Sequence, residues 1–138
     1  MCLSIYEFFL SENENYPQAI EDLTMCLRRR QDFLPLDSRC IAETHYQLGV
    51  ALGFDTQFDE AVNALNDAIS VLEKRVSNLK KSKESQESKE EAEKMEKEIT
   101  NIEWLILGIM DDVIRVLEKR VSNLKKSKES QGKYNLFS

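Results

Sequence analysis

Apolar residues recur at alternating steps of three and four along two long stretches of this chain. This spacing is a heptad seam, in which two positions of every seven face a partner helix. Residues 82–91, between the stretches, contain no apolar side chain and predict a solvated bend. The sequence therefore predicts two long helices, the first ending near Lys83, that fold back as an antiparallel, coiled-coil-like hairpin. The first seam joins Val62, Leu65, Ile69, Leu72, Val76 and Leu79, and the second joins Met95, Ile99, Ile102, Ile106, Ile109 and Val113.

Shorter amphipathic segments precede the hairpin, and their boundaries carry helix start and stop signals. Asn15 is expected to cap a helix in whose first turn Pro17 is tolerated. Pro35 ends that pattern, and Asp37 is expected to cap the next helix. Gly53 is expected to take the left-handed conformation in the turn that follows. The fold class that these segments predict is all-α.

Residues 42–68 carry small and large side chains at the fixed offsets of a tetratricopeptide repeat, a 34-residue unit of two helices. Gly49 and Ala61 are expected to be small because the two helices cross there with their backbones almost in contact. Large side chains are expected to fill the space beside the crossing. The residues assigned to repeat packing are Ala19 in an upstream unit and Leu48, Gly49, Phe58, Ala61, Leu65 and Ala68.

The repeat pattern and the seams divide the chain into three parts. Residues 1–70 are predicted to form about one and a half tetratricopeptide repeats, residues 71–131 a long helical capping hairpin, and residues 132–138 a frayed tail. Residues 2–10 are a poor match to the first helix of a repeat, because Glu7 stands where a small residue should pack.

Sixteen residues occur twice without change, at 71–86 and 116–131. Old structural repeats diverge, so this identity indicates a recent exon duplication or an assembly artefact rather than a selected repeat. The second copy extends the last helix with an apolar stripe that has no obvious partner left in the chain. An unpaired stripe favours self-association, so the C-terminal helix is a candidate surface for a homo-oligomer. The stripe consists of Ile114, Leu117, Val121 and Leu124.

The net charge of -6 is unevenly distributed along the chain. Residues 1–70 carry 12 acidic and 4 basic side chains, whereas residues 71–138 carry 13 acidic and 15 basic ones. The acidic half argues against direct binding to nucleic acid, because phosphates attract a basic surface. It is compatible with a basic protein partner held by charge complementarity, and equally with an ordinary acidic protein.

The chain lacks the residue patterns of an enzyme or a metal protein. Its single histidine, His45, falls at a packing position of the repeat, and Cys40 with His45 does not make a metal site. The adjacent carboxylates Asp59 and Glu60 point to different faces of a helix and cannot act as an acid–base pair. Three irregularly spaced cysteines favour a reduced, intracellular protein, and the first ten residues are too short to span a bilayer. We therefore expect no catalysis, no cofactor and no membrane segment.

A resemblance to the nuclear autoantigenic sperm protein family is carried by three blocks: SENENYPQA at 11–19, AETHYQLG at 42–49 and QFDEAV at 57–62. It continues loosely through EKEI at 96–99 and covers about 11–113. The family has about four repeats, an acidic insertion and a basic localisation tail, so the resemblance implies a partial member. It implies binding of histones H3 and H4, with linker histone as a second candidate. It also implies the nucleus, with the cytoplasm as the alternative because the tail is not matched.

In tetratricopeptide folds the first helix of each pair lines the inner groove. Glu43 is expected to pair with lysine or arginine of a partner, and Tyr46 to stack or hydrogen-bond. The alternatives are a solvated helix face for Glu43 and packing against the neighbouring repeat for Tyr46. The predicted partner-binding residues are Glu43, Tyr46, Gln47, Val50 and Phe54.

Two functions stay open on the sequence alone, beside the third possibility of a non-functional fragment. The first is a histone-binding chaperone module used in nucleosome assembly, as the resemblance implies. The second is a self-associating helical scaffold, or a generic tetratricopeptide interaction fragment without histone activity, which the apolar stripe of the last helix favours.

Overall fold

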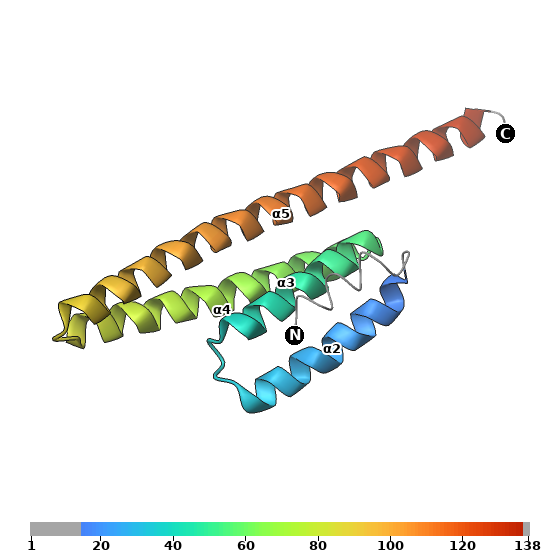
Figure 1. Cartoon of the computed structure of the whole chain (residues 1–138). Helices are drawn as coiled ribbons and strands as arrows, with labels where there is room; N and C mark the ends of the chain where they lie inside the picture. The colour runs from blue at the N-terminus through green and yellow to red at the C-terminus, as the bar shows by residue number, and fades with distance from the viewer. Residues whose placement is uncertain (1–14, 137–138) are drawn as a thin grey trace.

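The computed structural model describes residues 15–136, with side-chain surroundings through residue 129. Helices α2 (Tyr16–Phe33), α3 (Arg39–Phe54), α4 (Phe58–Ser85) and α5 (Lys89–Leu136) make up almost all of this part, which contains no strand (Figure 1). The all-α prediction is confirmed. The segment 2–10 lies outside the described residues. Helix α5 continues through Leu136, so 132–136 are helical where the sequence suggested a frayed tail.

The starts of α2 and α3 show how short polar side chains set the helix boundaries. The Asn15 side chain accepts a hydrogen bond from the backbone N–H of Gln18 at 3.4 Å, which confirms it as the cap of α2. Helix α3 is capped by Ser38, whose Oγ accepts from the backbone N–H of Cys40 at 3.2 Å. The prediction that Asp37 caps α3 is wrong, because its carboxylate instead faces residues of the long hairpin.

The turn between α3 and α4 places its left-handed residue later than predicted. Gly53 stays inside α3, and Thr56 has the positive φ of 63°. The backbone N–H of Gln57 donates to Leu52 O at 2.9 Å, and that of Thr56 donates to Gly53 O at 3.2 Å. These two bonds are the Schellman pattern, which requires its left-handed residue two positions after the last helical one. Because α3 continues to Phe54, that position is Thr56.

Helices α3 and α4 approach each other closely at Gly49. A Cβ atom added to Gly49 would lie 2.7 Å from the Leu65 side chain and 3.2 Å from Ala61 O. Ala61 and Ala68 are completely buried on the facing side of α4, whereas Phe58 is half-buried. The small residues therefore permit a tight contact that any larger side chain at Gly49 would disturb.

The core is divided between two sides of α3. On one side, Ala19 and Leu23 of α2 are buried with Ala51 of α3, and Leu48 packs against them. On the other, a larger cluster joins α3, α4 and α5. Its buried members are Ala42, Leu65, Ala68, Ile69, Leu72, Val76, Ile99, Ile102 and Ile109. The heptad positions of the two long helices thus supply seven of the nine buried members of this larger cluster.

Helices α4 and α5 run antiparallel and meet at a short turn (Figure 1). The turn comprises only residues 86–88, which is shorter than the bend predicted for 82–91. The polar ends of the helices stay helical because side chains join them across the hairpin: Lys83 pairs with Glu96. Ser88 accepts from the backbone N–H of Glu91 at 3.4 Å and so caps the start of α5.

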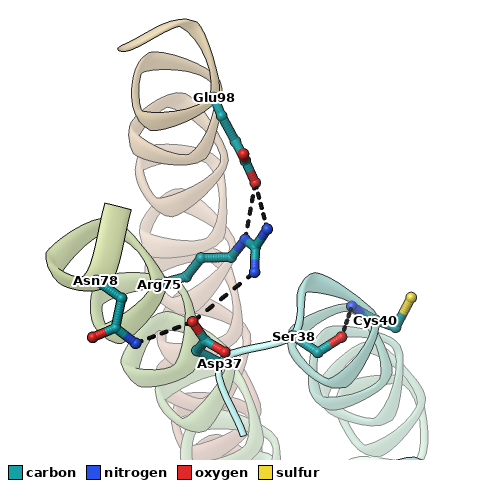
Figure 2. A network of polar contacts seen from close by, with 6 residues as sticks. All are labelled: Asp37, Ser38, Cys40, Arg75, Asn78 and Glu98. Carbon is teal, nitrogen blue, oxygen red and sulfur yellow. Dashed lines mark hydrogen bonds and ion pairs between the residues drawn. The ribbon is translucent and has the colours of Figure 1, made fainter. Parts of the chain in front are cut away.

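A polar network fastens the α2–α3 connection to the hairpin. Arg75 of α4 donates to Glu98 of α5 through Nε at 2.9 Å, and its Nη2 lies 2.8 Å from the same oxygen. Asp37 accepts from Asn78 Nδ2 at 3.1 Å and lies 3.9 Å from Arg75 Nη1 (Figure 2). Asp37, in the α2–α3 connection, therefore contacts α4 directly and is linked to α5 through Arg75.

The two identical segments have different surroundings. In the first copy Leu72 is 3% and Val76 is 8% exposed, whereas the matching Leu117 and Val121 are 40% and 51% exposed. The C-terminal part of α5 projects beyond the other helices (Figure 1). The same sequence is thus a core element once and a surface element once.

The predicted stripe of the second copy, Ile114, Leu117, Val121 and Leu124, is exposed, but other residues at the start of this copy contact the rest of the chain. Val116 packs against the cluster of Leu52, Ala61 and Ala64 at the α3–α4 turn. Arg120 Nη1 lies 2.6 Å from Asp59 Oδ1. The copy begins beside the start of α4, so its first residues find contacts there before α5 projects away.

Candidate partner-binding groove

A groove of about 830 Å³ lies between α3 and α5, and we call it the α3–α5 groove. Its lining is largely apolar, with a few charged side chains among the residues that border it. It is lined by Arg39, Cys40, Ala42, Glu43, Tyr46, Gln47, Leu72, Trp104, Leu105, Gly108, Ile109 and Asp112. An apolar groove with few polar groups is the usual form of a binding site in proteins.

Three of the five predicted partner-binding residues line this groove: Glu43, Tyr46 and Gln47. They stand on one side of α3 because residues three and four apart share a helix face. Glu43 and Tyr46 are half-buried, and Gln47 is buried. Helix α3 therefore supplies a wall with one carboxylate and one aromatic ring.

Tyr46 joins α3 to α5. Its hydroxyl donates to Asp112 Oδ2 at 2.6 Å, and Arg115 Nη1 lies 3.8 Å from the other oxygen of that carboxylate. The Tyr46 ring also packs against the large core cluster. Tyr46 thus packs against the α3–α4–α5 cluster while it lines the groove, and its bond to Asp112 links α3 to α5.

The opposite wall, on α5, was missed from the sequence. Trp104 is 70% exposed and Leu105 is 42% exposed, and both line the groove. A Cβ added to Gly108 would meet no atom within 4 Å, so the groove is open at that point. The sequence signal for this wall is that Trp104 and Leu105, two large apolar residues, lie between the heptad positions Ile102 and Ile106 and outside the seam.

Val50 and Phe54 do not line the groove. The Phe54 ring stacks on Tyr16 of α2 with centroids 5.5 Å apart, and Lys119 Nζ lies 5.2 Å from its centroid. Val50 is half-buried. The structure thus separates these two predicted residues from Glu43, Tyr46 and Gln47, because the last turn of α3 is engaged by α2 and by the second repeat copy.

His45 lies on α3 beside these residues, and it is half-buried. Burial lowers the pKa of its imidazole below the ordinary 6.5, and the nearby Asp67 carboxylate opposes part of that shift. The side chain is therefore neutral near pH 7. In the described part of the chain, no three His, Cys, Asp or Glu side chains are grouped as a metal site would need. None of the helices in that part has a stretch long and apolar enough to span a bilayer.

Comparison with known proteins finds relatives over about half of the chain. It is 46% identical over 70 residues to the nuclear autoantigenic sperm protein of Bos taurus and 44% identical over 70 residues to that of Homo sapiens. These matches cover 51% of this chain and 9% of each relative. These matches support a partial member of the nuclear autoantigenic sperm protein family.

Another relative of this chain is named for what it binds. The "Histone-binding protein N1/N2" of Xenopus laevis is 42% identical over 65 residues, which is 47% of this chain and 11% of that protein. The chain thus spans about a tenth of the length of the curated relatives it matches. No family model matches the chain.

Proposed function

We propose that this chain is a histone-binding chaperone module that acts in the nucleus and takes no part in catalysis. The observation that carries the proposal is the apolar α3–α5 groove, with Glu43 and Trp104 in its lining, in a relative of a histone-binding protein. Histones H3 and H4 are the proposed ligands, with linker histone as the second candidate. Use in nucleosome assembly follows from that ligand.

The groove suits an amphipathic, basic segment of a histone. Trp104 and Leu105 would contact the apolar side of the segment, since a helix in a groove binds through apolar anchors. Glu43 would pair with a lysine or arginine, and Trp104 could receive a cation on its ring face. The acidic balance of residues 1–70 would attract such a ligand from a distance.

We further propose that the scaffold is of the tetratricopeptide type. In that assignment α3 and α4 form one repeat, α2 is the second helix of the preceding one, and residues 71–131 form the capping hairpin. The close approach at Gly49, with Leu65 and Ala61 opposite, supports the assignment because this repeat type places small residues where its helices cross.

Titration of the chain with purified H3–H4 at moderate salt tests the proposal. Glu43→Lys is expected to weaken binding by about tenfold, since a like charge then faces the basic ligand. Trp104→Ala is expected to weaken it similarly because an exposed aromatic anchor is lost. Glu21→Lys makes the same charge change on the exposed face of α2, away from the groove, and is the matched control.

The outcomes separate a groove from a general charge effect. Binding by the parent that resists Trp104→Ala, and that Glu21→Lys weakens as much as Glu43→Lys, would show attraction without the groove. Absence of binding at micromolar concentrations would reject the histone function for this chain and leave the scaffold alternative.

A further inference from the structure

Helix α5 carries a second heptad seam that faces solvent, and we call it the outer seam. Its members follow steps of three, four, three, four and three, and each is between 40% and 56% exposed. The first four members each lie one residue beyond a buried or half-buried position (Ile106, Ile109, Val113 and Val116), so the outer seam is a separate stripe on the same helix. The outer seam consists of Leu107, Met110, Ile114, Leu117, Val121 and Leu124.

The duplicated sequence shows what can cover half of this seam. Leu117, Val121 and Leu124 correspond to Leu72, Val76 and Leu79 of the first copy. In the first copy these side chains belong to the core cluster, where isoleucines of an antiparallel helix cover them. The projecting part of α5 therefore presents the same side chains that, in the first copy, pack against an antiparallel helix.

The outer seam is symmetric about its centre, between residues 115 and 116. Its step pattern is the same in both directions, so an antiparallel second copy brings the seams into register along about 26 Å of helix, at 1.5 Å per residue. In that register Leu107 lies opposite Leu124 of the second copy, and Met110 lies opposite its Val121. Ile114 lies opposite its Leu117, so every layer pairs two apolar side chains.

Charges at the ends of the seam choose between the two directions. The heptad continues to Glu103 at one end and to Lys128 at the other, and both are exposed. An antiparallel pair sets Glu103 of each copy opposite Lys128 of the other, whereas a parallel in-register pair sets like charges together. Residues 103–112 hold three acidic and no basic side chains, and residues 119–128 hold five basic and no acidic ones.

A shallow hollow continues the outer seam onto α4. It has a volume of about 450 Å³ and is bordered by Met110 and Ile114 of the seam together with Ile69 and Glu73 of α4. Glu73 would meet the basic half of the second copy. The hollow connects the outer seam to the α4–α5 packing surface, so a paired helix would rest on two helices rather than one.

We infer that two copies of this chain associate as an antiparallel dimer through the outer seam of α5. The apolar layers bind the copies together, and the Glu103–Lys128 pairs set their direction. The inference does not rest on the histone proposal, since the α3–α5 groove and the outer seam use different faces of α5.

Sedimentation velocity of the full chain from about 1 to 100 µM tests the dimer, because that range brackets dissociation constants of moderate helix pairs. The parent is expected to shift from monomer to dimer with increasing concentration. Val121→Lys is expected to remain monomeric, since it places a charge within an apolar layer. Asn123→Lys adds the same charge to the same turn outside the seam and is expected to dimerise like the parent.

A charge exchange tests the antiparallel direction. Glu103→Lys and Lys128→Glu are each expected to weaken dimerisation by about tenfold, because each creates two like-charge contacts per dimer. The double variant restores opposite charges and is expected to regain most of the parent's affinity. Circular dichroism and thermal unfolding of each variant verify that the monomer is folded.

Three results would overturn the inference. A parent that stays monomeric through the whole range rejects the dimer. Equal loss from Asn123→Lys and Val121→Lys assigns association to charge rather than to the seam. A double variant weaker than both single variants rejects the antiparallel register.

Discussion

At the scale of single residues, the turn after α3 holds Thr56 in a conformation that suits glycine. Its φ of 63° places a β-branched side chain in the left-handed region, which costs L-residues about 1–2 kcal/mol. The two Schellman hydrogen bonds offset this free-energy cost, because they satisfy carbonyl groups in the last turn of α3.

Thr56→Gly is expected to stabilise the fold by about 0.5–1 kcal/mol, since glycine takes this conformation without steric strain but loses more backbone entropy on folding. Thermal or urea unfolding measures the difference from the parent. Gly53→Ala is the informative companion, because Gly53 has helical geometry and alanine is expected to be tolerated there. A loss of stability in Thr56→Gly would contradict the argument from strain.

His45 is expected to make stability depend on pH between about 5.5 and 7, where the unfolded imidazole titrates. Its pKa in the folded chain is lowered by burial, so the unfolded state binds the proton more readily. Stability therefore falls as pH decreases through the unfolded pKa of about 6.5 towards the lower folded value. The lowered pKa of the Glu96 carboxyl, caused by its hydrogen bond from Lys83, acts only at more acidic pH.

Urea unfolding at several pH values measures this slope, and His45→Gln is expected to flatten it because the chain has no other histidine. An equal slope in the parent and in His45→Gln would show that another group controls stability in this range.

At the scale of elements, the two copies of the sixteen-residue segment separate helix propensity from packing. Both copies are helical, so the sequence forms a helix in each place. Only the first copy is buried, because only it lies against the isoleucine face of α5. Arg75 and Arg120 likewise find different carboxylates, Glu98 and Asp59.

Val76→Ala is expected to cost about 1–3 kcal/mol, because it removes buried methyl groups and leaves a cavity. Val121→Ala, the identical change in identical local sequence, is expected to alter the stability of the monomer by less than about 0.5 kcal/mol. Chemical unfolding at low protein concentration compares the two variants. Similar costs would mean that Val121 is covered in the monomer.

At the scale of the whole molecule, the sequence predicts the helices better than it predicts what they touch. The spacing from Leu65 to Leu79 and from Ile99 to Ile109 is set by burial against one neighbour, and burial leaves a period in the sequence. The all-α class follows from that period. Gly49 was likewise singled out by its offset, and the structure has Leu65 close against it.

The remaining features depend on contacts between distant segments, which have no local period. Ser38 rather than Asp37 caps α3 because Asn78 and Arg75, far along the chain, engage the Asp37 carboxylate. Trp104 lines the groove because α5 packs against α3 and α4 through Ile99, Ile102 and Ile109, far along the chain. Phe54 lies outside the groove, and its ring stacks on that of Tyr16. A local sequence pattern therefore does not predict contacts between side chains that are far apart in the sequence.

The duplication has a direct consequence for amide hydrogen exchange measured by mass spectrometry. A peptide such as VSNLK is released with the same mass from 76–80 and from 121–125, so one isotopic envelope reports two places. The copy at 76–80 lies in the core hairpin and is expected to exchange slowly, whereas the copy at 121–125 lies on the projecting end of α5 and is expected to exchange quickly. The envelope should therefore split into two peaks of equal area, and slow exchange of both halves at high concentration would reveal the projecting helix becoming covered.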